Sequence, residues 1–257
     1  MAGRSMTAPT LLGADLIRTV VDAARHSPRN LQQAIGPSEV GHPCSRRIAY
    51  KVAGAPRTWT DADPWASIIG TAVHAWLAAA FAAENLVLDE PRWLVEQRVH
   101  PSSGLSGSCD LYDTHTDTVI DHKVVGSTTL ADAKAHGPTP QYRIQVHTYG
   151  LGWERLGKQP REVAIAYWPR SGYLSGLYVW REPYDRSIAD AALDRLSNIS
   201  AAALSLDIVE HPERTALIPA APSDSCSHCA YKSSAARDGG CPDTPRRQAP
   251  TSIPGVT

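Results

Sequence analysis

The segment SGSCDLYDTHTDTVIDHKVVG in the middle of the chain carries the carboxylates of Asp110 and Asp121 and the ammonium group of Lys123. If this segment folds as a β-hairpin with its turn centred at His115–Thr116, Asp110 lies directly opposite Asp121. Asp121 and Lys123 are two residues apart on one strand and share a face, which is also the face of Asp110. Such a patch is suited to bind Mg²⁺ or Mn²⁺ through oxygen, and its lysine to stabilise charge on a phosphate.

The hairpin also has a simpler interpretation as a salt bridge on a solvated sheet face. In the predicted register Cys109 and His122 point to the opposite face, and a slip of one residue would separate the acidic side chains from each other. The hairpin alone therefore leaves both interpretations open.

The five cysteines form a second pattern. Cys226, Cys229 and Cys241 make a C-x2-C-x11-C cluster near the C-terminus, while Cys44 and Cys109 stand alone upstream. Thiolates at this spacing are typical of zinc or iron–sulfur sites, which take four sulfur ligands. The C-terminal trio needs one more ligand, and either isolated cysteine is able to supply it.

Two apolar segments of helical periodicity carry further polar groups. Gly70–His74 places an imidazole within an otherwise apolar helix. Gln145 and Tyr149 are spaced i, i+4 on one face of a later helix, and Gln141 lies one turn earlier on that face. Taken singly, each of these is more often part of ordinary packing than of a site.

The framework that must position these groups is a mixture of helices and strands. Apolar residues recur at helical spacing in an N-terminal segment and again after Asp63–Pro64, which resembles a helix start. Beyond that second helix they alternate with a period of two, which is typical of strands. The sequence predicts helices at 11–35, 64–85, 130–136, 140–156 and 185–206, and strands at 94–99, 107–113, 118–125, 163–168 and 174–181. Residues 37–57 are punctuated by Gly and Pro, and the chain after 211 is loop-like.

Together and in this order, the motifs resemble the PD-(D/E)XK nuclease superfamily, and within it the RecB-like branch. The family order is a helix with G-x-x-x-H, a strand ending in Asp, a strand with (D/E)-x-K, and a helix with Q-x-x-x-Y. The counterparts here are Gly70–His74, Asp110, Asp121–Lys123 and Gln145–Tyr149. The resemblance implies an α/β fold with a restriction-endonuclease-like core, which is a central mixed sheet flanked by helices.

The cysteines extend this resemblance. One cysteine followed by arginines and a tyrosine, with three more near the C-terminus, is similar to the iron–sulfur members of the branch: CRISPR-associated RecB-like exonucleases, phage relatives and AddB-type nuclease domains. The resemblance implies a 4Fe–4S cluster that joins the N- and C-terminal segments through Cys44, Cys226, Cys229 and Cys241. It covers residues 37–241, the expected nuclease domain. The residue pattern predicts a helical segment at 1–36, and the Pro-, Thr- and Arg-rich composition predicts a disordered tail at 242–257.

The resemblance further implies a role for each site residue. His74, Asp110, Asp121 and the backbone carbonyl of His122 bind the divalent metal. Lys123 positions or helps to deprotonate the attacking water and stabilises the phosphate. The remaining implied roles are orientation of the lysine or the DNA backbone by Gln145 and Tyr149, and DNA binding by Arg46, Arg47, Lys51 and Gln141.

Composition bounds these expectations. The chain has 257 residues, 42% hydrophobic and 20% charged, which is typical of a globular protein rather than a disordered one. Its net charge of −1 argues against a protein that coats nucleic acid through bulk positive charge. Residues 42–57 nevertheless carry four basic and no acidic residues, which allows a local basic surface.

We therefore expect a metal-dependent exodeoxyribonuclease acting on single-stranded DNA or DNA ends, in recombination, repair, phage DNA metabolism or CRISPR-type end processing. No G-x4-G-K-[ST] motif is present, so unwinding would need a helicase or recombination partner. No secretory signal is visible, and the apolar stretch Ala72–Ala83 is shorter than the roughly 20 residues of a membrane span, so a cytoplasmic protein without a membrane partner is expected. The alternative is a non-catalytic DNA-binding or adaptor protein with a structural zinc or iron–sulfur site.

Overall fold

The computed structural model describes residues 11–26, 34–57, 63–222, 226, 229–232 and 241. The predicted tail at 242–257 and the stretch 27–33 of the first predicted helix lie outside these residues. The helices and strands are α1 (Leu11–Arg25), α3 (Pro37–Val40), α4 (Ser45–Val52), α5 (Trp65–Asn85), β1 (Trp93–Ser102), β2 (Leu105–Asp113), β3 (Thr118–Val125), α6 (Ser127–His136), α7 (Pro140–Arg155), β4 (Glu162–Pro169), β5 (Tyr178–Pro183) and α8 (Arg186–Ser205), with 3₁₀ turns η1 (Leu174–Gly176) and η2 (Pro212–Leu217).

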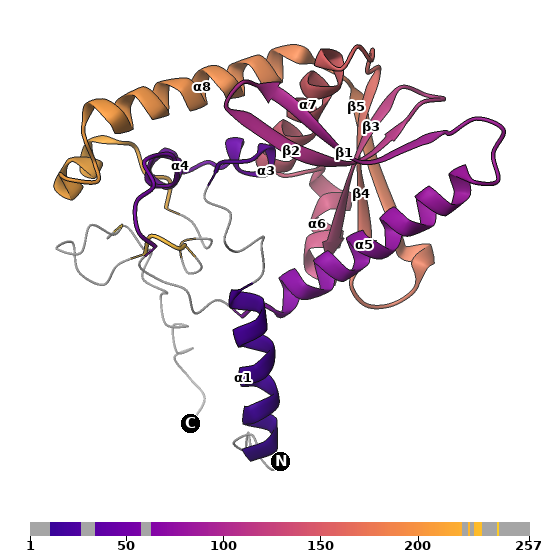
Figure 1. The fold of residues 1–257 in the computed structure, drawn as a ribbon, viewed down its shortest axis with the longest axis horizontal. Helices are drawn as coiled ribbons and strands as arrows, with labels where there is room; N and C mark the ends of the chain where they lie inside the picture. The colour runs from indigo at the N-terminus through magenta and orange to yellow at the C-terminus, as the bar shows by residue number, and fades with distance from the viewer. Residues whose placement is uncertain are drawn as a thin grey trace, which may run out of the picture.

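The five strands form one mixed sheet in the order β1-β2-β3-β4-β5, as the α/β prediction requires (Figure 1). All neighbours are antiparallel except β3 and β4, which are parallel and therefore need the crossover through α6 and α7. Helices α5 and α7 cover opposite faces: His122 of β3 stacks on Phe81 of α5, while the adjacent Asp121 is bonded to Gln145 of α7. Helix α8 packs outside, against α7 and α4.

The hairpin register is the predicted one. Leu111 pairs with Ile120, and the two following pairs keep the same register down to the turn. Asp113 stabilises that turn, because its carboxylate accepts hydrogen bonds from the His115 N–H at 3.0 Å and the Thr116 hydroxyl at 2.9 Å. The ladder ends after the Leu111–Ile120 pair, so the two strands separate just where the acidic pair was expected.

A distortion in β1 and β2 changes which side chains share a face. The strands pair on both sides of Glu96 and Asp110 but not at these two residues, and Glu96 has a φ of 50°, in the left-handed region. Cys109 consequently packs in the core with Tyr149 and Trp153 of α7, while Asp110 turns toward α5. The predictions that Cys109 points away from the Asp121 face and that Asp110 shares this face are both wrong, because alternation is not kept through the distortion.

Two other segments differ from the sequence prediction. Residues 37–57, to which the sequence assigned no element, form α3 and α4, and the latter buries Arg46, Ile48, Ala49 and Tyr50 on one side. The predicted strand at 174–181 begins later, at Tyr178, because Leu174–Gly176 form a 3₁₀ turn.

Helix α5 is apolar on almost every side. It is long and apolar enough to cross a membrane, judged by length and mean hydropathy alone. Leu77 is buried and Phe81 packs on Trp93 of β1, while Trp65 and Trp76 are 59% and 69% exposed. The same helix carries His74 against the sheet, so its inward side belongs to the site described next.

Candidate active site

The site lies where β2 and β3 separate. Asp110 no longer pairs with β3 through its backbone; instead its Oδ2 accepts the N–H of His122 at 2.6 Å. Its Oδ1 lies 3.2 Å from Nδ1 of His74 on α5. Burial alone would raise the pKa of Asp110, but these contacts outweigh it and hold that pKa below its usual range, whereas the hydrogen bond to Asp110 raises the pKa of His74.

Asp121, Lys123 and Gln145 form a closed triangle on the other side of β3. The Lys123 ammonium lies 2.5 Å from Asp121 Oδ2 and donates to Gln145 Oε1 at 3.0 Å. Gln145 in turn donates to Asp121 Oδ1 at 2.8 Å. The spacing of Asp121 and Lys123 on a strand, and their contact with the helix motif at Gln145, are as the sequence predicted.

The environment of Asp121 is suited to a cation. Its side chain is 2% exposed, and burial raises its pKa to about 6, opposed by Lys123 and reinforced by Asp110. Although Lys123 is close to Oδ2, that oxygen has no hydrogen bond of acceptable geometry. A buried carboxylate needs a compensating positive charge, which the Lys123 ammonium supplies here and which a metal ion would supplement.

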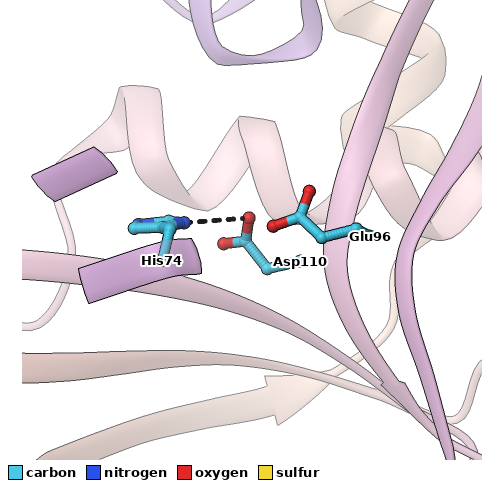
Figure 2. Close-up of side chains that lie close together, drawn as sticks. All are labelled: His74, Glu96 and Asp110. Atoms are coloured by element: carbon cyan, nitrogen blue, oxygen red, sulfur yellow. Dashed lines mark hydrogen bonds and ion pairs between the residues drawn. The ribbon is translucent and has the colours of Figure 1, made fainter. Parts of the chain in front are cut away.

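Glu96 is a site residue that sequence reasoning missed. Within the described part of the chain, His74, Glu96 and Asp110 are the one group of three acidic, histidine or cysteine side chains whose ligand atoms all lie within 4.8 Å of one another. Figure 2 shows Asp110 between the other two, with the Glu96 carboxylate turned toward it. Burial, followed by the nearby Asp110 charge, raises the pKa of Glu96. The signal was present only in the β1–β2 register, where Glu96 is opposite Asp110.

The His122 ring lies against the neighbouring His74 imidazole. It stacks on Phe81 at 5.8 Å and contacts the edge of His74 at 6.0 Å, while Trp168 Nε1 donates to its Nδ1 at 3.3 Å. Burial lowers the pKa of His122 to about 4, so the ring is neutral and accepts this bond at neutral pH. Its backbone is therefore fixed beside Asp110, where its carbonyl was predicted to act.

The other residues of the Q-x-x-x-Y helix have different surroundings. Tyr149 is 6% exposed in the core, where burial raises its pKa well above 10. Gln141 donates to the Ser38 carbonyl at 2.6 Å. A second residue missed from the sequence is Tyr142, whose ring centroid lies 4.7 Å from the Lys123 ammonium.

The predicted DNA-binding residues of α4 are engaged within the protein. Arg46 is 7% exposed and donates to the Ile218 carbonyl at 3.1 Å and to Cys241 Sγ at 3.8 Å. Lys51 pairs with Glu39 at 2.6 Å. Arg47 is half-buried and lies 3.2 Å from a ring nitrogen of His42. A role for these residues in DNA binding stays a prediction.

The fold brings the N-terminal and C-terminal cysteines into one region. Cys44 is the residue before α4, and α4 shares an apolar cluster with Cys229, Tyr231 and Cys241. The Cys229 N–H donates to the Cys226 carbonyl at 3.2 Å. Burial chiefly raises the pKa of Cys229, and the neighbouring thiols of Cys44 and Cys241 add to the effect.

Comparisons with known proteins agree with the family that the motifs resemble. A family model described as the PD-(D/E)XK nuclease superfamily matches residues 92–234. Among solved structures, an alkaline exonuclease from Laribacter hongkongensis has a TM-score of 0.50 at 16% identity, over 77% of this chain and 98% of that one. The same exonuclease in complex with dAMP has a TM-score of 0.49 at 16% identity, over 72% and 94%.

A phage-related exonuclease from Haemophilus somnus has a TM-score of 0.41 at 15% identity, over 70% of this chain and 98% of that one. At these identities the structural likeness concerns the fold alone. No curated protein sequence matches the chain.

Proposed function

The chain belongs to the PD-(D/E)XK nuclease superfamily, and from this premise we propose that it is a metal-dependent exonuclease that hydrolyses phosphodiester bonds of single-stranded DNA or DNA ends. The observation that carries the proposal is the gathering of His74, Asp110, Asp121 and Lys123 at the point where β2 and β3 separate. The fold neighbour from Laribacter hongkongensis is an alkaline exonuclease, which supports cleavage from ends.

The donor set fits Mg²⁺ or Mn²⁺. The residues that would hold the ion are His74, Asp110, Asp121 and the carbonyl of His122. We add Glu96 from β1 because its carboxylate lies within 4.8 Å of the ligand atoms of His74 and Asp110. The carboxylates of Glu96, Asp110 and Asp121 carry more negative charge than the single Lys123 ammonium offsets, which is the structural reason to expect a cation. When bound, a divalent ion neutralises charge on the scissile phosphate and lowers the pKa of a water molecule.

The protein's own side chains have distinct tasks in this proposal. Lys123 lies beside Asp121 and directs its ammonium to the attacking water and the phosphate oxygens. Gln145 bridges the acid and the lysine, so it keeps both side chains in one arrangement. Tyr149 acts from the core, by fixing the helix from which Gln145 projects.

We also propose that Cys44, Cys226, Cys229 and Cys241 hold a 4Fe–4S cluster. The support is that Cys44 directly precedes α4, that α4 shares an apolar cluster with Cys229 and Cys241, and that the Arg46 guanidinium lies against the Cys241 sulfur. A cluster would supply a rigid cross-link between the two ends of the domain. The proposal has four further parts. They are a basic surface around Arg47, DNA end processing in recombination, repair or phage metabolism, a helicase partner and a cytoplasmic location.

The decisive experiment is degradation of single-stranded DNA labelled in turn at its 5′ and 3′ ends, with Mg²⁺, with Mn²⁺ and with chelator. We expect metal-dependent release of short products, and loss of at least 100-fold in rate for Asp121→Ala and Lys123→Ala. Asp132→Ala, which removes an exposed carboxylate on α6, is the matched control and should cut normally. DNA that is bound but left intact by the wild type would instead favour the non-catalytic DNA-binding alternative.

A further inference from the structure

The ammonium of Lys123 is enclosed on three sides. Asp121 Oδ2 lies 2.5 Å away, Gln145 Oε1 accepts a hydrogen bond at 3.0 Å, and the face of the Tyr142 ring lies 4.7 Å from the nitrogen. The lysine side chain is only 15% exposed. A charge this far from water is stable only where neighbouring groups replace its hydration, and an aromatic face does so through its negative quadrupole.

Building on the proposed nuclease function, we propose that Tyr142 is a positioning residue that holds the Lys123 ammonium in the site through the face of its ring. The local structure explains how the ring is fixed. Tyr142 lies in the first turn of α7, its N–H is capped by the Thr139 hydroxyl at 3.3 Å, and its ring packs against the hydrophobic core. It is one turn before Gln145, so both side chains reach Lys123 from the same face of the helix.

The ring matters most when a divalent cation occupies the site. In the metal-free arrangement Asp121 is the nearest partner of Lys123. A cation bound to the same carboxylate repels the ammonium and competes for its partner oxygen. Of the three contacts described above, those with Gln145 and Tyr142 are then left, one a neutral amide and the other a neutral ring.

The test compares Tyr142→Phe, which keeps the ring, with Tyr142→Leu, which keeps the apolar volume but removes the quadrupole. We expect kcat within twofold of wild type for the Phe variant and a fall of about 5- to 30-fold for the Leu variant, with KM within about twofold. Tyr178→Leu is the matched control, because Tyr178 packs on the same core and stacks on Tyr167 at 6.0 Å. It should keep both constants within twofold.

The split between kcat and KM separates positioning from loosened packing. Misplacement of the Lys123 ammonium lowers kcat and leaves KM nearly unchanged, and the Phe variant, which keeps the ring face, does not show this fall.

The outcomes are distinct. A wild-type protein that does not cut DNA refutes the proposed function itself. An active wild type with a Leu variant of unchanged kcat refutes the role of Tyr142. A Phe variant as slow as the Leu variant also refutes it, because the hydroxyl would then be the group that matters. Circular dichroism and melting curves establish that each variant is folded.

Discussion

The two aspartates of the site differ in their readiness to accept a proton. Hydrogen bonds hold the pKa of Asp110 low, whereas burial raises that of Asp121 to about 6, and the contact with Asp110 raises that of His74 above 6.5. A ligand must lose its proton before it binds a metal ion. The metal and the proton therefore compete at Asp121 and His74 near neutral pH but not at Asp110.

The first prediction concerns the affinity for Mn²⁺. Above the raised pKa of His74 both ligands are free of protons, and affinity is nearly independent of pH. Between that pKa and pH 6 one proton must be displaced, so affinity falls about tenfold per pH unit, and below pH 6 two are displaced and it falls up to about a hundredfold. Isothermal titration calorimetry of the metal alone, from pH 8 to pH 5, measures this. His74→Ala should lose one of the two steps.

Residue-scale inference from the sequence was accurate where chemistry and periodicity coincide. Asp121 and Lys123 are two apart on a strand, so their shared face followed from alternation. Glu96 was missed because it joins the site through a left-handed backbone conformation that no periodicity indicates. Tyr142 was missed because an aromatic residue beside a polar motif is more often part of the core.

At the scale of elements, the tight turn between β2 and β3 sets the register on which the site depends. Arg92 binds the Asp113 carboxylate through two nitrogens, at 2.9 and 2.7 Å, and the same carboxylate organises the turn. Burial would raise the pKa of Asp113, but Arg92 and the turn hold it below 3.8. The ionised acid therefore stabilises the fold above the pKa of the unfolded chain, and this stabilisation is lost as the pH falls through the lowered value.

The second prediction follows from the lowered pKa of Asp113. Asp113→Ala should cost about 2–3 kcal/mol at pH 7, less than a fully buried pair would because Arg92 is one-third exposed. Urea denaturation at pH 7 and at pH 3 measures it, and the difference from wild type should shrink at the lower pH. Asp190→Ala removes a carboxylate from an exposed pair on α8 and should stay within about 0.5 kcal/mol at both. A cost that is equal at pH 7 and pH 3 contradicts the argument.

The third prediction concerns two helical glycines in different surroundings. A Cβ on Gly152 of α7 would lie 2.6 Å from Cγ2 of Val99, which is fully buried on β1, whereas a Cβ on Gly70 of α5 would meet nothing within 4 Å. Gly152→Ala should therefore destabilise by about 1–3 kcal/mol, and Gly70→Ala should stabilise by up to about 1 kcal/mol. Thermal melts measure both. Cβ of Val99 also lies 2.7 Å from the position of a Cβ on Gly152 and is kept in Val99→Ala, so in this background the cost of Gly152→Ala should fall only in part.

The elements were predicted well where a cap or a period marked them. Asp185 caps α8 through the Ser187 N–H at 2.9 Å, and the α7 helix begins at its proline. Helix α4 has eight residues among glycines and prolines, and it is stabilised by contacts with α8 and the C-terminal cysteine region that are distant in sequence. Such tertiary stabilisation of a short helix leaves little local signal.

On the scale of the whole molecule, the proposed cluster would join Cys44 to cysteines more than 180 residues later. Closing so long a loop restricts the unfolded chain by an amount worth about 5 kcal/mol in the chain-entropy account. Contacts among the described residues there include the stack of Tyr50 on Tyr231 at 5.1 Å and the hydrogen bond from the Tyr50 hydroxyl to Thr215 at 3.1 Å. The cross-link is expected to add to this attachment of the C-terminal region.

The fourth prediction tests this attachment. Anaerobically purified protein should be brown with about four irons per chain, and Cys44→Ser or Cys229→Ser should each lose the colour, melt at a lower temperature and release the C-terminal region to limited proteolysis. The double variant should be no worse than either single variant, because one cross-link is lost in all three. Cys109→Ala is the control: its thiol is buried in the β-sheet core, so iron content should not change. A colourless protein holding one zinc would keep the cross-link and refute the iron–sulfur cluster. A metal-free protein with an equally protected C-terminal region would refute both the cluster and the cross-link, since packing alone would then hold the two ends of the domain together.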